Sequence, residues 1–174
     1  MNLQHLSPLS GAQPRVDGKF LAVWAERFLI KGVAYGTFAP DAEGVQFPAR
    51  AVVARDFQMM AAAGLNTVRT YTVPPDWLLD SAAEHGLRLM IGMPWAQHIA
   101  FLDDARLARQ IRREAAATVH RLASHPAAFL FAVGNEIPPS VVRWHGQRRV
   151  EAFLEDLATD AKSAAPNALL TYVN

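Results

Sequence analysis

The residues best placed for chemistry are Asn135 and Glu136, which follow a near-continuous apolar run from Phe129 to Val133. A buried strand that ends in an amide and a carboxylate delivers both groups to one edge of a sheet. Apolar surroundings disfavour the charged form of a carboxylic acid, so such a group can keep its proton near neutral pH. The pattern therefore indicates a general acid.

Other polar or aromatic side chains recur just past the carboxyl ends of the predicted strands. These candidate ligand-contacting residues are Tyr35, Arg69, Tyr71, Trp95, His98 and Asn174. In parallel α/β folds, ligands bind at that edge of the sheet. The segment GVAYGTF does not match GxGxxG, so nothing here favours a dinucleotide site.

Apolar strand patterns alternate with helical patterns along the chain. Strands are expected at residues 20–23, 28–35, 66–71, 87–93, 128–133 and 168–173, and helices at 48–64, 74–86, 105–124 and 147–165. Asp103 or Asp104 is expected to cap the third helix, and Pro138-Pro139 to stop regular structure after Glu136. The alternation predicts a parallel sheet wrapped by helices, either an open doubly wound sheet or a (β/α) barrel.

Composition excludes several classes of protein. The 174 residues carry a net charge of +1 and no cysteine, which argues against a nucleic-acid surface, disulfides and thiolate metal sites. No HExxH-like spacing occurs, and neither a metal nor a cofactor is expected. No run approaches the ~20 apolar residues of a membrane span, and the first residues lack a signal-peptide pattern, so a cytoplasmic location is expected. Residues 1–15 are predicted to be a flexible leader and residues 16–174 one domain.

Three runs, LNTVRTY, LRLMIGMPW and HPAAFLFAVGNE, resemble in order and spacing the catalytic barrel of retaining glycoside hydrolases. The likeness is to family 2, the β-galactosidase and β-glucuronidase-like TIM barrels, and ERFLIKGVAYG is similar to the segment entering barrel strand one. The resemblance covers Val16 to Asn174. It implies an α/β fold of the (β/α)8 TIM-barrel type, truncated after about strand five. It also implies a protein that acts on O-glycosidic bonds of β-linked oligo- or polysaccharides.

The resemblance also implies roles for individual residues. Glu136 matches the acid/base carboxylate after strand four, and Asn135 matches the amide that contacts the sugar 2-hydroxyl. Arg69 matches the arginine on strand two that orients the nucleophile, while Trp95 and His98 occupy sugar-contacting positions. The alternatives to these functional roles are structural: Glu136 could cap a turn, Arg69 could form an ordinary ion pair, and Trp95 could pack in the core.

The family's nucleophile is a second glutamate after strand seven, which these residues do not reach. The acids after Glu136, namely Glu151, Glu155, Asp156 and Asp160, lie on a helix expected to be solvated, as does Arg112 on the preceding one. The isolated chain is therefore predicted to be inactive and to need the missing half-barrel or self-association. The alternative is a non-catalytic carbohydrate-binding or regulatory module of a larger polysaccharide-synthesis or glycosyltransferase protein.

Overall fold

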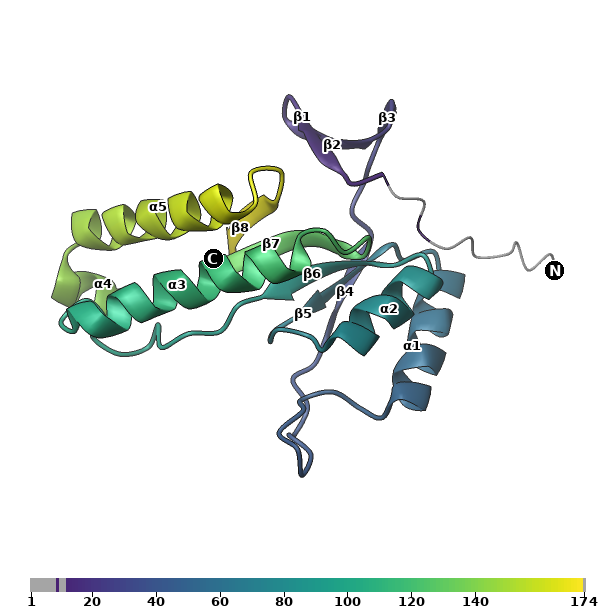
Figure 1. Cartoon of the computed structure of the whole chain (residues 1–174), viewed down its shortest axis with the longest axis horizontal. Coiled ribbons are helices and arrows are strands. Elements are labelled where there is room, and N and C mark those ends of the chain that lie inside the picture. Colours follow the sequence, from purple (N-terminus) through teal and green to yellow (C-terminus); the bar gives the residue numbers. More distant parts are fainter. Residues whose placement is uncertain (1–8, 10–11, 174) are drawn as a thin grey trace. The chain divides into compact units, whose positions relative to one another are not determined.

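The computed structural model describes Leu9 and residues 12–173 (Figure 1). The predicted leader lies mostly outside the described residues, and so does Asn174. The chain divides into two compact units. The first unit comprises Met1–Ile91 with His125–Phe129, and the second comprises Gly92–Ser124 with Leu130–Asn174.

Five strands form a sheet in the order β4-β5-β6-β7-β8, so spatial order follows chain order. The strands are β4 (Gly32–Tyr35), β5 (Thr67–Thr70), β6 (Arg88–Gly92), β7 (Ala128–Asn135) and β8 (Leu169–Val173). The helices are α1 (Arg50–Ala62), α2 (Asp76–Glu84), α3 (Ala105–Leu122), α4 (Pro139–His145) and α5 (Gln147–Ala164). At least one helix separates each strand from the next along the chain, which confirms the predicted α/β class.

In the first unit, α1 packs against α2 beside β4, β5 and β6 (Figure 1). The buried residues of α1 are Val53, Phe57 and Ala61, spaced four apart on one helical face. The helix ends at Ala62, and Gly64 then adopts a positive φ of 82° that favours glycine. The predicted helix is therefore confirmed, with its ends shifted by about two residues as is usual.

The strand expected at residues 28–35 begins only at Gly32. The side chain of Asn66 occupies the backbone groups that a longer strand would pair: its Oδ1 accepts from Lys31 N at 2.9 Å, and its Nδ2 donates to Leu29 O at 2.8 Å. Leu29 is 64% exposed and Ile30 is 48% exposed, so these two residues before β4 do not enter the core.

A separate antiparallel sheet precedes β4. It contains β1 (Arg15–Asp17), β2 (Phe20–Val23) and β3 (Glu26–Arg27) in the order β1-β2-β3. Only β2 was expected from the sequence, because the two flanking strands are too short to show a periodic pattern.

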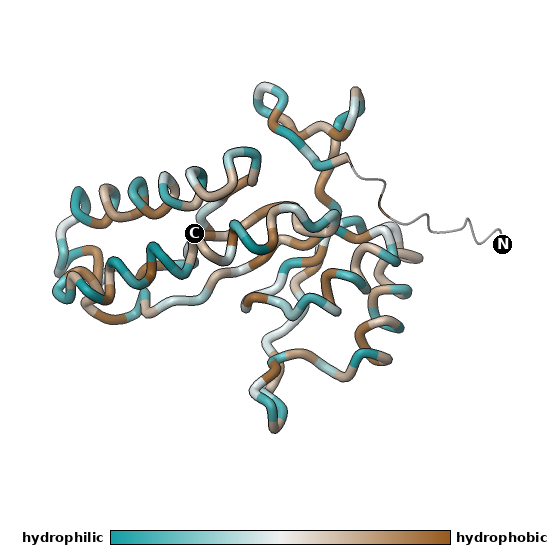
Figure 2. Tube along the Cα trace, in the orientation of Figure 1, coloured by the Kyte–Doolittle hydropathy of each residue, from teal (hydrophilic) through white to brown (hydrophobic). Residues whose placement is uncertain are grey.

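In the second unit, α3 packs against α5 (Figure 1). Figure 2 shows hydrophilic and hydrophobic residues alternating along both helices, the pattern of helices with one apolar face. Asp104 caps α3 as expected, since its Oδ1 accepts from Arg106 N at 2.7 Å. Arg112 is partly exposed, and its guanidinium binds Asp160 at 2.7 Å and Asp156 at 2.5 Å on the neighbouring helix.

Helix α4 corrects the prediction that Pro138-Pro139 ends regular structure. Pro139 is the first residue of the helix, where a missing N–H is tolerated and the fixed φ suits the helical backbone. The helix ends on His145, whose buried Nε2 accepts from Leu102 N at 3.3 Å. Across the described part of the chain, no helix has the length and apolar character needed to cross a membrane.

Candidate functional site

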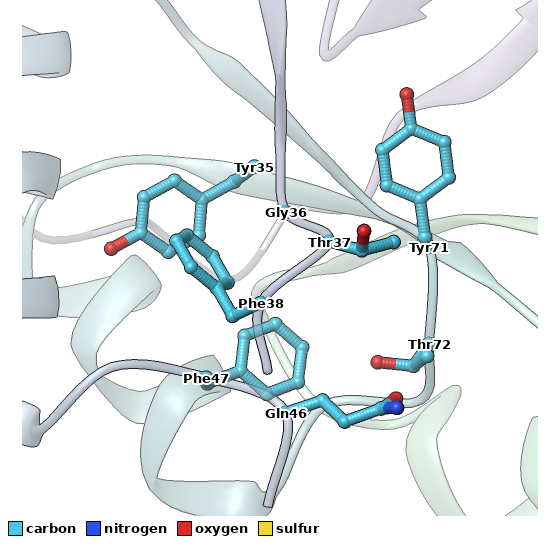
Figure 3. Close-up of a pocket in the computed structure, with 8 residues that line it drawn as sticks. All are labelled: Tyr35, Gly36, Thr37, Phe38, Gln46, Phe47, Tyr71 and Thr72. Carbon is cyan, nitrogen blue, oxygen red and sulfur yellow. The ribbon is translucent and has the colours of Figure 1, made fainter. Parts of the chain in front are cut away.

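The carboxyl ends of β4 and β5 lie side by side in the first unit, because Tyr35 is in register with Thr70. The loops that follow these two strands therefore leave the sheet at the same edge. They form a small open pocket, here called the rim pocket (Figure 3). Its lining residues are Tyr35, Gly36, Thr37, Phe38, Gln46, Phe47, Tyr71 and Thr72.

The loop after β4 is folded back by Asp41. Its Oδ1 accepts from Val45 N at 2.7 Å and from Glu43 N at 3.1 Å, which makes the tight turn that returns Gln46 to the rim pocket. Figure 3 shows the end of the Gln46 side chain pointing toward Thr72. None of the eight lining residues is charged, so the rim pocket presents hydroxyl and amide groups beside aromatic rings, a surface suited to a neutral polyhydroxylated ligand.

Tyr35 lines the rim pocket and is fixed by contacts with α1 and Phe38. Its hydroxyl donates to Asp56 Oδ2 on α1 at 2.8 Å. Its ring packs edge-on against the Phe38 ring, with 4.9 Å between the ring centroids. Burial, together with this hydrogen bond to a carboxylate, raises the pKa of Tyr35 well above its ordinary value. The tyrosine is therefore neutral, and its hydroxyl is committed to α1.

Arg69 lies on β5, one residue before the strand ends. Its guanidinium stands 4.8 Å from the centre of the Tyr71 ring, and Tyr71 is 38% exposed. A cation over an aromatic face is attracted by the electron-rich ring. Three of the predicted site residues, Tyr35, Arg69 and Tyr71, thus lie at the neighbouring ends of β4 and β5. Arg69 is in register with Ala34 and not with Tyr35, so the Tyr35 and Arg69 side chains project from opposite faces of the sheet.

In the second unit, β7 is irregular where it ends. Ala132 pairs with Thr171 and Asn135 pairs with Val173, so β7 has one more residue than β8 between these two pairs. Such a bulge twists a strand and re-aims the side chains beyond it. Glu136 follows directly, with an exposed side chain and a φ of 48°. This left-handed conformation is uncommon for a residue with a side chain, and such outliers cluster at functional sites.

Three contacts hold the backbone around Glu136. Asn135 N donates to Gln97 Oε1 at 3.2 Å, and Glu136 N donates to Val173 O at 2.9 Å. Ile137 N donates to the Tyr172 hydroxyl at 2.8 Å. Sequence reasoning missed Gln97 and Tyr172, which nonetheless follow or end a predicted strand, the position that marked the other candidates.

Gly134 lets two rings approach the backbone just before Glu136. A Cβ added at Gly134 would lie 2.8 Å from Tyr172 Cε2 and 3.4 Å from Trp95 Cζ2. Trp95 Nε1 donates to Val133 O at 2.8 Å, and its ring packs edge-on against Phe101 at 4.9 Å. Trp95 therefore has packing partners within the second unit, and only its partly exposed surface remains for a ligand.

The remaining predicted residues are placed as follows. His98 is exposed in the turn after β6, and Asn174 lies outside the described residues. Glu136 is exposed and has a left-handed backbone, so apolar side chains of the described residues do not enclose it, contrary to the expectation from the apolar run before it. Within residues 12–173 and Leu9, no group of three or more His, Asp or Glu could hold a metal ion.

Comparison with known proteins gives a match of fold. No protein-family model matches the chain, and no curated protein matches its sequence. Among solved structures, a Parabacteroides merdae β-glucuronidase aligns over 91% of this chain with a TM-score of 0.76 and 21% identity. A Bifidobacterium dentium β-glucuronidase complexed with coumarin-3-O-glucuronide aligns over 92% with a TM-score of 0.74 and 15% identity.

A Ruminococcus gnavus β-glucuronidase also matches, with a TM-score of 0.65 and 16% identity over 88% of this chain. The alignments cover 20%, 26% and 26% of these three proteins, so the chain spans about a fifth to a quarter of their length. At these identities the likeness shows the fold. The chain has the α/β fold of one part of these β-glucuronidases, as a partial TIM barrel would.

Proposed function

We propose that this chain is part of a glycoside hydrolase that cleaves O-glycosidic bonds of β-linked carbohydrates with retention of configuration, and that Glu136 is its acid/base. The observation that carries the proposal is the placement of Glu136. An exposed carboxyl group follows a parallel strand in a left-handed conformation, and neighbouring strand ends hold the backbone around it. A fold shared with β-glucuronidases supports the same chemistry.

In this proposal Glu136 protonates the glycosidic oxygen as the bond breaks, because an unprotonated sugar oxygen is a poor leaving group. It then removes a proton from the water that releases the sugar. Asn135 contacts the sugar 2-hydroxyl, and Arg69 orients the nucleophile. In the second unit, Trp95 and His98 contact other parts of the saccharide. In the first unit, the rim pocket contacts a neutral saccharide.

A retaining mechanism also needs a second carboxylate about 5–5.5 Å from the acid. The acids that follow Glu136 are on α5, and Arg112 binds two of them, Asp156 and Asp160. We therefore propose that the nucleophile comes from polypeptide other than these residues. The protein that contains this chain, rather than the chain alone, is the object to assay.

The test compares leaving groups in the protein that contains this chain. Glu136→Gln removes the proton donor without changing the shape of the side chain. We expect kcat/KM for a methylphenyl β-glycoside to fall by about 10²–10⁴, the usual contribution of general acid catalysis. Cleavage of a dinitrophenyl β-glycoside, whose leaving group needs no proton, should fall by less than about tenfold in the same variant, because that acid contribution is not required.

Glu155→Gln, at an exposed position on α5, is the matched control and should leave both rates unchanged. Equal rates for Glu136→Gln and the unmodified protein on both substrates would contradict the proposal. The pairing of the α5 acids with Arg112 also favours a second candidate function, a carbohydrate-binding barrel module. That function predicts saccharide binding without hydrolysis in the unmodified protein as well.

A further inference from the structure

The backbone from Val133 to Ile137 is held by three side chains in addition to one bond to β8, from Glu136 N to Val173 O at 2.9 Å. Past the bulge in β7, the next pairing to β8 is shifted by one residue, so the ladder cannot satisfy these groups in sequence. Trp95, Gln97 and Tyr172 bind groups on either side of that bond, one contact each, at Val133 O, Asn135 N and Ile137 N. These three side chains are here called the brace, and all of them belong to the second unit.

The brace contacts both sides of Glu136. Gln97 binds the amide of the residue before it, and Tyr172 binds the amide of the residue after it. Gln97 is 7% exposed, so its acceptor is largely shielded from competing water. A left-handed backbone is disfavoured for a glutamate and persists only where surrounding contacts determine it. Two fixed flanking amides are such contacts.

We infer that Gln97 and Tyr172 are positioning residues that direct the Glu136 carboxyl toward the glycosidic oxygen. The inference rests on the proposed role of Glu136 as the acid/base. Neither side chain is required to touch the substrate, because each acts through a backbone amide next to Glu136. A catalytic group displaced by about 1 Å can lose on the order of 10² in rate, so a brace of this kind has a large effect on proton transfer.

Two substitutions remove the brace contacts with little change in shape. Tyr172→Phe keeps the ring that packs on Gly134 and removes the hydroxyl that accepts from Ile137 N. Gln97→Met keeps the length of the side chain and removes the acceptor for Asn135 N. Thr171→Val is the matched control, since it changes a hydroxyl on the same strand as Tyr172 at a residue outside the brace.

The expected result in the protein that contains this chain is a loss of rate only for the substrate whose leaving group needs a proton, here called the leaving-group signature. Tyr172→Phe and Gln97→Met should each lower kcat/KM for the methylphenyl β-glycoside by about 10–100-fold, because its leaving group needs a positioned acid. The kcat/KM for the dinitrophenyl β-glycoside should change by less than about threefold, because its leaving group needs no proton. Gln97→Glu, which retains an acceptor oxygen, should recover part of the loss. In amide hydrogen exchange, Ile137 should exchange at least about tenfold faster in Tyr172→Phe because its hydrogen bond is lost.

The outcomes separate this inference from the proposed function. If Glu136→Gln shows the signature but both brace variants behave like Thr171→Val, the positioning role is wrong and the acid/base role stands. If each brace variant lowers kcat/KM equally for both substrates and also lowers the melting temperature, the two residues have only a structural role and the inference is overturned. If Glu136→Gln itself lacks the signature, the acid/base role fails and the positioning role fails with it.

Discussion

The two units hold their strand ends in different ways. In the first unit, the ends of β4 and β5 carry the rim pocket, whose walls are side chains and whose lining has no charge. In the second unit, the ends of β7 and β8 carry an exposed carboxylate, and the surrounding side chains bind backbone atoms around it. The first arrangement is suited to contact a neutral ligand. The second is suited to fix one ionisable group.

This difference has a physical origin in what each task requires. Binding a neutral saccharide distributes the binding free energy over several contacts from rings, hydroxyls and amides. Proton transfer uses one group, and its rate falls steeply when that group moves. A bulge, a left-handed glutamate and an obligatory glycine within residues 132–136 are the local features of such a fixed group.

The largest effect on this comparison is expected for Gly134→Ala. The new Cβ would meet the Tyr172 ring at 2.8 Å, so the ring or the strand must move. Overpacking of this kind costs about 2 kcal/mol of unfolding free energy, measurable by urea denaturation. Gly18→Ala is the control: it has no neighbour within 4 Å, and its φ of 61° alone should cost about 1 kcal/mol. Equal losses for both variants would show that the close approach to Tyr172 is not a constraint.

A smaller effect is expected in the rim pocket. Thr72→Val removes a hydroxyl and keeps the shape, so binding of methyl β-glucopyranoside, measured by NMR titration, should weaken by about 3–10-fold through one lost hydrogen bond. Glu136→Gln should leave this binding unchanged if the pocket binds and the carboxylate reacts. Thr159→Val on α5 is the control. Unaltered affinity in Thr72→Val would show that the rim pocket does not bind the saccharide.

The smallest effect is expected far from both strand ends, at Arg112. Hydrogen bonding from Arg112 lowers the pKa of Asp160 below its ordinary value of 3.8. A lowered pKa in the folded state stabilises the protein above pH 3.8, and this contribution is lost as the pH falls through the lowered value. Arg112→Met should therefore cost about 0.5–1 kcal/mol at pH 7, as partly exposed ion pairs do, and much less at pH 2.

Arg113→Met, at the exposed neighbouring position, should change the unfolding free energy by less than Arg112→Met at pH 7. A loss for Arg112→Met that is the same at pH 7 and pH 2 would exclude the ion pairs as its cause. Neither variant should alter saccharide binding or hydrolysis, because α3 and α5 carry no part of the rim pocket or the brace.

The elements that the sequence predicted well are those with a strong local period. The buried residues Ile111, Ala115 and Val119 mark α3 at helical spacing, and the apolar run before Asn135 marks β7. The sequence pattern does not predict helix α4, because two consecutive prolines usually interrupt regular structure, although proline suits the first helical position. The strand before Gly32 was overextended because the Asn66 contacts are tertiary and leave no periodic trace.

The candidate site follows the same division. Glu136 and Arg69 could be picked out because they follow or end apolar strands, which is a local pattern. Gln97 and Tyr172 also follow or end predicted strands, but their contacts with the backbone around Glu136 depend on a bulge that shifts β7 against β8 by one residue, and no local pattern reveals it. The preference for glycine at position 134 likewise cannot be predicted from the sequence, because it arises from the tertiary contact with the Tyr172 ring.

The most direct measurement uses azide with Glu136→Gln in the protein that contains this chain. With the dinitrophenyl β-glycoside, a retaining enzyme that lacks its base accumulates the glycosyl-enzyme, and azide can attack that intermediate without proton removal. The account predicts faster turnover with azide and a β-glycosyl azide product identified by NMR. An α-glycosyl azide would make Glu136 the nucleophile instead, and no response to azide would contradict the assignment of Glu136 as acid/base.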